Sequence, residues 1–162
     1  MMRSVMKELM ICALLFSFFL YSEGAMGKHH LKTERIKTMK IESPVFKHRE
    51  RIPSKFTCDG ENINPPLKMT GVPHTAKSLV LIMDDPDAPM GTWVHWTLWN
   101  IPPQTVEILE KSLPKGAVEG VQSWKKRGYG GPCPPSGTHR YFFKLYALDT
   151  LLDLPAPADK AQ

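Results

Sequence analysis

The sequence predicts an all-β fold, an antiparallel β-sandwich with Greek-key connections. From Ile41 onward, short apolar segments alternate with breaks made of Pro, Gly, Asn and Asp. Aromatic residues are concentrated in several of these segments, as packed strands prefer. The 162 residues also contain 15 prolines, which disfavours long helices. Several short strands separated by turn signals are typical of a sandwich.

The two central candidate strands have different patterns. Ser78–Asp84 is almost wholly apolar, so we expect it to be buried on both faces. Val94–Ile101 is aromatic, and strict alternation would place one set of side chains on a single face. That set is Trp93, His95, Thr97 and Trp99. Further candidates are strands at Lys40–Ser43, Lys55–Thr57 and His139–Leu148, and a short helix within Thr105–Leu113.

The N-terminus resembles a secretory signal. Arg3 and Lys7 give it a positive start, and an apolar run follows from Leu9 to Tyr21. This run is shorter than the about 20 residues of a membrane span. We therefore expect no stable span after cleavage, and an uncleaved anchor is the alternative. The predicted organisation is a signal peptide (1–27), a flexible linker (28–38) and one domain (39–162), located in the periplasm or secreted.

Charge and cysteine content limit the partners. The net charge of +5 favours anionic partners, but the Lys125-Lys126-Arg127 cluster is too short to predict nucleic-acid binding. A protein partner and a homodimer stay open. Two cysteines, Cys58 and Cys133, follow the predicted signal, and an oxidising compartment would allow them to pair. Two free, buried thiols are the alternative.

The first functional motif is Asp84-Asp85-Pro86-Asp87-Ala88-Pro89, which emerges from a predicted buried strand and is followed by His95. Its prolines make the loop stiff. The functional interpretation is an aspartate that faces a histidine, orients its imidazole and favours the cation. The structural alternative is a rigid turn in which aspartates accept from backbone N–H groups. An EF-hand is excluded because the mid-loop glycine and the final glutamate are absent.

The second motif runs from Gly128 to Gly137 and leads into His139-Arg140-Tyr141. Its glycines allow backbone N–H groups to approach an anion closely. On a strand, His139 and Tyr141 would share one side, whereas Arg140 would point away and pair with an acid. If the two motifs meet, two imidazoles, a carboxylate and a phenol surround one pocket. That set of groups suits a phosphate-like anion.

Two catalytic alternatives rank below anion binding. A hydrolase would need Ser136 or Ser123 as the nucleophile, and neither lies in a Gly-x-Ser-x-Gly elbow. A zinc site would draw on ligands without the close spacing typical of zinc motifs. Those candidates are Cys133, His95, His139 and Asp85. We therefore expect no enzymatic activity and no cofactor.

Together these motifs resemble the phosphatidylethanolamine-binding protein family, in particular its bacterial and archaeal branch, often labelled Raf-kinase-inhibitor-like. The resemblance covers residues 39–158 in separated blocks. The blocks that carry it include Phe56–Asn62, Asp85–Pro89, Gly131–Tyr141 and Leu145–Asp149.

The resemblance implies a β-sandwich with small peripheral helices and a pocket for phosphate or phospholipid headgroups. It implies a binding or regulatory protein without shared catalysis, and inhibition of a protease or other partner through another surface is the alternative function. The implied ligand-binding residues are Asp85, His95, His139, Tyr141, Gly131, Pro132 and Trp93. The family's C-terminal helix looks missing or truncated, because the sequence reaches a candidate N-cap, Asp159, shortly before Gln162.

Overall fold

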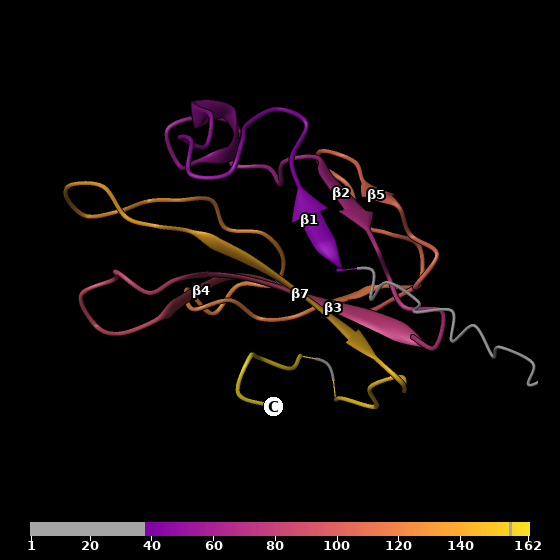
Figure 1. Ribbon diagram of the computed structural model, residues 1–162. Helices are drawn as coiled ribbons and strands as arrows, with labels where there is room; N and C mark the ends of the chain where they lie inside the picture. Colours follow the sequence, from indigo (N-terminus) through magenta and orange to yellow (C-terminus); the bar gives the residue numbers. More distant parts are fainter. Residues whose placement is uncertain (1–37, 156) are drawn as a thin grey trace, which may run out of the picture. The chain divides into compact units, whose positions relative to one another are not determined.

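The computed structural model describes residues 38–155 and 157–162 (Figure 1). The chain divides into two units, Met1–Glu34 and Arg35–Gln162, and every described residue lies in the second. The expected signal peptide (1–27) and nearly all of the expected linker (28–38) therefore lie outside the described residues. Within the described ranges, no helix combines the length and the apolar character needed to cross a bilayer.

Antiparallel pairing forms two sheets, which confirms the all-β prediction. One sheet has the strand order β1-β2-β5 and the other the order β6-β4-β3-β7. The strands are β1 (Lys40–Glu42), β2 (Leu67–Thr70), β3 (Ser78–Asp85), β4 (Trp93–Ile101), β5 (Glu107–Ile108), β6 (Val118–Glu119) and β7 (Phe142–Leu148). The chain crosses between the sheets after β2, β4 and β5.

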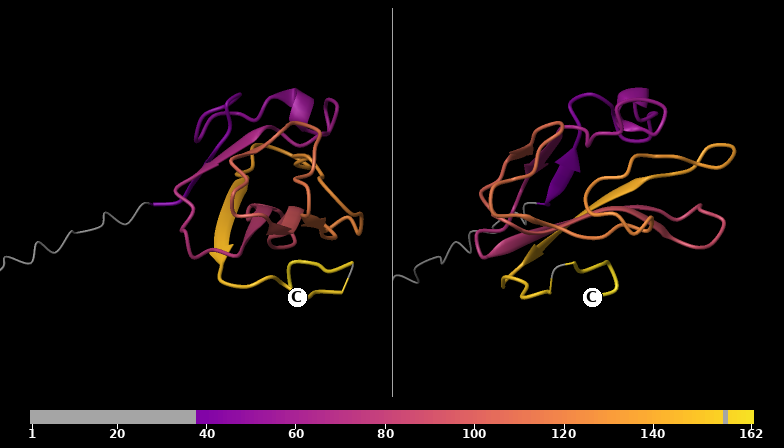
Figure 2. Two further views of the ribbon diagram at one scale, coloured as in Figure 1. Left: turned by 90° about the vertical axis from the view of Figure 1, so that its right-hand side faces the viewer. Right: turned by 180° about the vertical axis from the view of Figure 1, so that it is seen from behind.

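The core lies between the two sheets, which face each other in the views of Figure 2. Both sheets contribute large apolar side chains that solvent hardly reaches, and burial of each contributes roughly 1.5–3 kcal/mol. This core, rather than the polar residues at the strand ends, therefore supplies most of the stability. Its members are Leu67, Met69, Leu79, Leu81, Met83, Trp96, Leu98, Ile101 and Ile108.

Two local predictions are wrong. Ser54–Phe56 forms a 3-10 turn (η1), not part of a strand at Lys55–Thr57. The segment Thr105–Leu113 contains β5 instead of a helix, because Glu107–Ile108 pairs with β2. At the candidate N-cap, Asp159, the carboxylate accepts a hydrogen bond from the N–H of Ala161 in a turn.

The connection from β6 to β7 positions the candidate site. These strands lie at opposite edges of the four-stranded sheet, so residues 120–141 must cross from one edge to the other. They pass the start of β4, where the N–H of Ser123 donates to the carbonyl of Val94 and the N–H of Gly130 to the carbonyl of His95. His139 and Tyr141 precede β7, which begins at Phe142 and not at His139 as expected.

Candidate functional site

A β-bulge in β4 sets the direction of the His95 side chain. Met83 on β3 pairs with Trp96 on β4. The next residue of β3, Asp84, pairs with Val94. His95 is therefore the extra residue and has no partner on β3. A bulge bends its strand and re-aims a side chain, and bulges are frequent next to functional sites.

The bulge also changes which residues of β4 share a face. Trp93 pairs with Asp85, whereas Thr97 pairs with Ile82. Asp85 and Ile82 are three residues apart on β3 and so point to opposite faces of the sheet. The expectation that Trp93, His95, Thr97 and Trp99 share one face is therefore wrong, because the extra residue interrupts the alternation.

His95 is neutral and its tautomer is fixed. The side chain is nearly inaccessible, and Nδ1 lies 2.7 Å from the carbonyl oxygen of Gly130. Because a carbonyl only accepts, Nδ1 carries the hydrogen. Burial lowers the pKa of His95 and outweighs the Gly130 carbonyl and the charge of Asp85, which favour the cation. Nε2 therefore presents a lone pair at neutral pH.

Asp85 orients the second imidazole. Its Oδ2 lies 2.7 Å from Nδ1 of His139, and both side chains are largely buried. Its Oδ1 accepts from the N–H of Asp87 at 2.8 Å. The functional and the structural interpretation of the aspartate motif thus apply to the same residue: one oxygen closes the turn and the other holds an imidazole.

Tyr141 and Trp93 add unused hydrogen-bond donors. The Tyr141 ring meets His95 edge-on, with centroids 5.2 Å apart and planes at 90°. Burial, aided by the charges of Asp85 and Asp87, raises the pKa of Tyr141 to about 12, so the phenol keeps its proton. Among the described residues, neither its hydroxyl nor Nε1 of Trp93 has a hydrogen-bond partner, although both atoms are buried. Unpaired buried polar groups are rare and call for an explanation.

The glycine loop supports the site but does not offer the expected backbone donors. The N–H of Gly130 donates to the carbonyl of His95 at 2.9 Å. The N–H of Gly131 donates to Oδ1 of Asn62 at 2.7 Å. For these two glycines, the expectation that backbone N–H groups of the motif approach an anion is therefore wrong. A side chain at position 131 would collide with the carbonyl of Phe56, so glycine is needed there for close packing.

A disulfide fastens the glycine loop to the segment after η1. Cys58 and Cys133 are bonded, with Cα atoms 5.4 Å apart. The N–H of Cys58 donates to the carbonyl of Pro132, whose side chain is buried. The hydroxyl of Tyr129 donates to the carbonyl of Phe56 at 2.7 Å. Pro132 thus braces the loop that holds His95, and the free-thiol alternative is wrong.

The other two carboxylates of the motif bind cations away from the imidazoles. Asp84, with a fully buried side chain, contacts Nζ of Lys144 at 2.7 Å and Nζ of Lys160 at 2.6 Å. Burial opposes ionisation of Asp84, but the two lysines outweigh it and lower the pKa of the carboxyl. On the surface, Asp87 and Arg140 form the ion pair expected for Arg140, with two contacts of 2.6 and 2.9 Å.

One residue of the site was missed from the sequence. The Trp124 ring meets His95 and Trp93 edge-on, at centroid distances of 5.0 and 5.3 Å. It is still 40% exposed and so lies at the mouth of the site. A tryptophan inside an otherwise polar segment, next to a basic cluster, was the available signal, because such a residue has no place in a core pattern.

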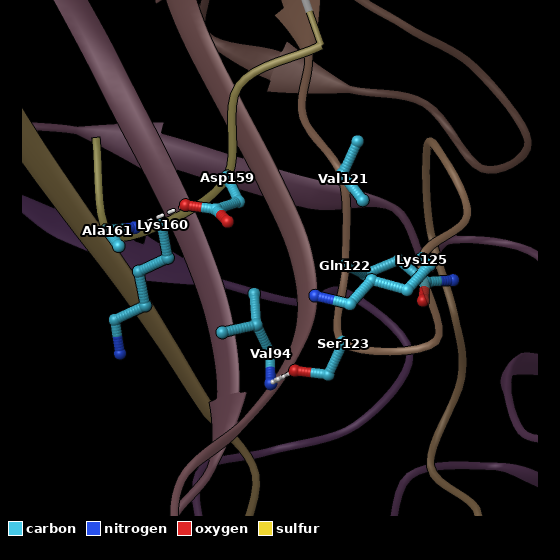
Figure 3. Close-up of a pocket in the computed structure, with 8 residues that line it drawn as sticks. All are labelled: Val94, Val121, Gln122, Ser123, Lys125, Asp159, Lys160 and Ala161. Atoms are coloured by element: carbon cyan, nitrogen blue, oxygen red, sulfur yellow. Dashed lines mark hydrogen bonds between the residues drawn. The ribbon is translucent and has the colours of Figure 1, made fainter.

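A separate cavity lies beside the site (Figure 3). Its volume is about 390 Å³, and it lies between β4, the segment after β6 and the end of the chain. None of the predicted ligand residues lines it. Its walls are Val94, Val121, Gln122, Ser123, Lys125, Asp159, Lys160 and Ala161.

Two of the groups named in the catalytic alternatives are engaged in other contacts. Cys133 is bonded to Cys58 and offers no thiolate. The hydroxyl oxygen of Ser123 accepts from the N–H of Val94 at 2.9 Å. In the part of the chain that the structure describes, no three His, Cys, Asp or Glu side chains form a group able to hold a metal ion.

Two relatives match most of the chain. A UPF0098 protein of Methanothermobacter thermautotrophicus is 55% identical over 127 residues, which are 75% of this chain and 84% of the archaeal protein. A UPF0098 protein of Pyrococcus horikoshii is 44% identical over 98% of this chain and 81% of its own length.

Solved structures show the same fold. A structure from Chlamydia trachomatis, described as a phosphatidylethanolamine-binding protein (PEBP) homolog, superposes with a TM-score of 0.75 at 40% identity, covering 78% of this chain and 85% of that one. YbcL of E. coli, described as a new member of the mammalian PEBP family, gives 0.71 at 33% identity, covering 76% and 85%. The family described as phosphatidylethanolamine-binding protein matches residues 42–162, and the chain therefore belongs to that family.

Proposed function

We propose that this protein is a non-catalytic binding protein whose site at the end of β3 and the start of β4 holds a phosphate or a phosphoryl headgroup. It belongs to a family of binding and regulatory proteins, which supports the general part of the proposal. One observation carries the specific part. His95, His139 and Tyr141 converge around Asp85, and each has a polar atom without a protein partner among the described residues.

The protonation states of the site residues determine which ionised form of a phosphate can bind. Tyr141 can only donate to an anion, because its phenol stays protonated. His95 offers a lone pair at Nε2 and so needs a donor from the ligand. A fully ionised phosphate has no donor, whereas a phosphomonoester monoanion keeps one P–OH group. An ammonium group on a zwitterionic headgroup would satisfy the same lone pair.

Titration calorimetry with glycerol phosphate tests this assignment. The second pKa of a phosphomonoester is about 6, so the monoanion becomes scarce above that pH. We expect binding on the order of tenfold tighter at pH 6 than at pH 8, with net proton uptake in buffers of different ionisation enthalpy. Glycerophosphoethanolamine, a diester without a second acidic proton, should show a much flatter profile. Affinity that rises with pH would contradict the assignment.

Variants connect the binding to the named residues. Tyr141→Phe removes a hydrogen bond to a charged ligand, which contributes roughly 1.5–3 kcal/mol, so affinity should fall by about tenfold or more. His139→Ala should weaken binding at least as strongly. His74→Ala, in an exposed loop, is the matched control. Equal affinities for all three variants would place the anion elsewhere.

We also propose that the protein acts in the periplasm or outside the cell. The Cys58–Cys133 disulfide supports this, because such bonds persist in oxidising compartments. Fractionation of the host followed by thiol alkylation would test it. Recovery of the protein from the cytoplasm with two free thiols would contradict it.

A further inference from the structure

We propose that His139 is a phosphorylation site, whose Nε2 takes a phosphoryl group from a small phosphoramidate, a donor with a phosphorus–nitrogen bond, and keeps it covalently. The inference rests on the proposed function, because the donor first enters the same anion site. It adds a chemical modification to reversible binding. Each protein molecule is modified once, so the reaction regulates the site and is not turnover.

The imidazole of His139 is held in the arrangement that a nucleophile needs. Nδ1 lies 2.7 Å from Oδ2 of Asp85, so the carboxylate accepts the Nδ1 hydrogen and the lone pair of the neutral ring is on Nε2. Nε2 makes no hydrogen bond in the part of the chain that the structure describes, and 10% of the side chain stays exposed. Histidine forms covalent intermediates when an adjacent group orients and activates it. Nε2 is therefore the reactive nitrogen.

The β3–β4 hairpin fixes the position of this nucleophile through two carboxylates. The N–H of Arg140, the next residue after His139, donates to Oδ2 of Asp87 at 2.8 Å. The N–H of Asp87 donates to Oδ1 of Asp85 at 2.8 Å. Figure 1 shows the hairpin and the loop before β7 extending side by side beyond the sheets. A nucleophile that is already positioned loses little further freedom when it reacts.

Two buried donors are available to the oxygens of a transferred phosphoryl group. Tyr141 lies two residues after His139, and its ring meets His95 edge-on. Among the described residues, its hydroxyl and Nε1 of Trp93 have no hydrogen-bond partner. Phosphoryl transfer depends mainly on positioning and on stabilisation of charge on the equatorial oxygens. Donors that are shielded from water and not already bonded are suited to that task.

The lone pair of His95 selects the class of donor. Its Nδ1 donates to the carbonyl of Gly130, so Nε2 accepts and needs a hydrogen from the ligand. The zwitterion of phosphoramidate supplies one, because its nitrogen is an ammonium group. The dianion of an acyl phosphate has no hydrogen to offer. A donor with a phosphorus–nitrogen bond therefore matches this site better than an acyl phosphate does.

The transfer balances without an additional reactant. The lone pair on Nε2 of His139 forms a bond to phosphorus, the phosphorus–nitrogen bond breaks, and its electron pair leaves with the nitrogen as ammonia. Nδ1 keeps its hydrogen, so the phosphorylated ring is a cation. The carboxylate of Asp85 accepts from that hydrogen and stabilises the positive ring.

Mass spectrometry of the full chain after incubation with phosphoramidate tests the modification. The protein should gain the mass of one phosphoryl group, which acid removes and alkali does not. Alkaline peptide mapping should place it on His139, and phosphorus NMR should place it on Nε2. The exposed His48 and His74 are internal controls and should react at least about tenfold more slowly. An unmodified protein, equal modification of His74 and His139, or phosphorus on Nδ1 would overturn the proposal.

Variants test the roles of the neighbouring residues at a saturating concentration of phosphoramidate. His139→Asn should abolish the modification, whereas His74→Asn, in an exposed loop, should keep the wild-type rate. Asp85→Asn should slow the reaction about tenfold, because the amide does not stabilise the cationic ring. Tyr141→Phe should slow it to a similar extent. Modification of Asp85→Asn at the wild-type rate would overturn the assignment. Circular dichroism confirms that each slow variant is folded.

Two further measurements separate this inference from the proposed function. Binding of glycerol phosphate without modification by phosphoramidate would overturn the phosphorylation and leave the anion site standing. Modification of His139 in a protein that does not bind glycerol phosphate would contradict the proposed function instead. If both hold, glycerol phosphate should slow the modification by competition, and the modified protein should lose its affinity for glycerol phosphate. Equal affinities of the modified and unmodified proteins would overturn the placement of the phosphoryl group in the anion site.

Discussion

Asp84 and Asp85 are neighbours at the end of β3, yet they serve opposite faces of the sheet. The Asp84 carboxylate is fully buried and held between Lys144 and Lys160. The Asp85 carboxylate is almost as buried, but its side-chain partner is the imidazole of His139. Successive strand residues point to opposite faces, so the two carboxylates do not share an environment.

The difference separates a structural charge from a charge that faces the candidate site. On one face, the carboxylate of Asp84 is bound by two lysines. On the other face, Asp85 contacts Nδ1 of His139, and Nε2 of that ring takes no part in the contact. Only the face with Asp85 therefore carries the groups that we propose to bind a ligand, and the face with Asp84 should matter for stability alone.

The largest expected effect is on stability, in the Lys144→Met/Lys160→Met variant. Both changes together leave the buried Asp84 carboxylate without a cation. Breaking a buried pair costs about 3–5 kcal/mol, and because both lysines are partly exposed we expect about 3 kcal/mol. Urea unfolding measures this loss, and phosphate affinity should stay within about twofold.

A third change serves as the control. Asp84→Asn in the same background removes the stranded charge and should recover most of the lost stability. If the double variant were as stable as the wild type, Asp84 would not depend on its lysines and the contrast between the two faces would fail.

Asp85→Asn should have the second largest effect, and on ligand binding rather than on stability. The amide keeps the size of the carboxylate but no longer supplies a charge to orient His139. Hydrogen bonds to charged groups contribute roughly 1.5–3 kcal/mol, so affinity for glycerol phosphate should fall about tenfold. Calorimetry on Asp85→Asn and Asp84→Asn compares the faces directly. Equal losses of affinity would show that the faces are not separate.

The pH dependence of the free energy of unfolding tests the environment of His95 in the candidate site. Burial lowers the folded-state pKa of His95 below its ordinary value of 6.5. Between these two pKa values the unfolded chain binds a proton that the folded protein does not, so stability falls as pH drops below about 6.5, by at most about 1.4 kcal/mol per pH unit. The difference in the free energy of unfolding between pH 5 and pH 8, measured with urea, should be smaller for His95→Gln than for the wild type. An unchanged difference would mean that His95 is not the buried base.

The sequence predicted the parts of the fold that local patterns encode. The apolar run at Ser78–Asp84 and the aromatic run at Val94–Ile101 lie within β3 and β4. The fold class could also be predicted, because strand-like apolar segments and the turn residues between them are both local features of the sequence. β2 was missed because only two of its four residues are buried, too few to form a pattern.

Register and tertiary contacts explain the remaining errors. The bulge at His95 depends on pairing with β3, which alternation within one strand cannot indicate. The same holds for the backbone donors: Gly131 has the flexibility of an anion nest, but Asn62 occupies its N–H. Lys160 is 76 residues from Asp84, so no local motif joins them. By contrast, the gathering of Asp85, His95, His139 and Tyr141 followed from two stiff loops, each next to a histidine, and from the family resemblance. Their role in ligand binding stays a prediction.

The smallest expected effect comes from the third carboxylate, Asp87. Its partner Arg140 holds the pKa of this carboxyl well below its usual range, but the ion pair lies on the surface. Exposed pairs are screened by water and salt, so Asp87→Asn should leave urea unfolding at neutral pH unchanged within error. Because Arg140 adjoins His139, a change in phosphate affinity of about twofold is expected. If Asp87→Asn weakened binding as much as Asp85→Asn, the surface pair rather than the buried carboxylate would be orienting His139. The residue that controls ligand binding would then lie in the β3–β4 hairpin loop, and the two faces of β3 would not explain the difference.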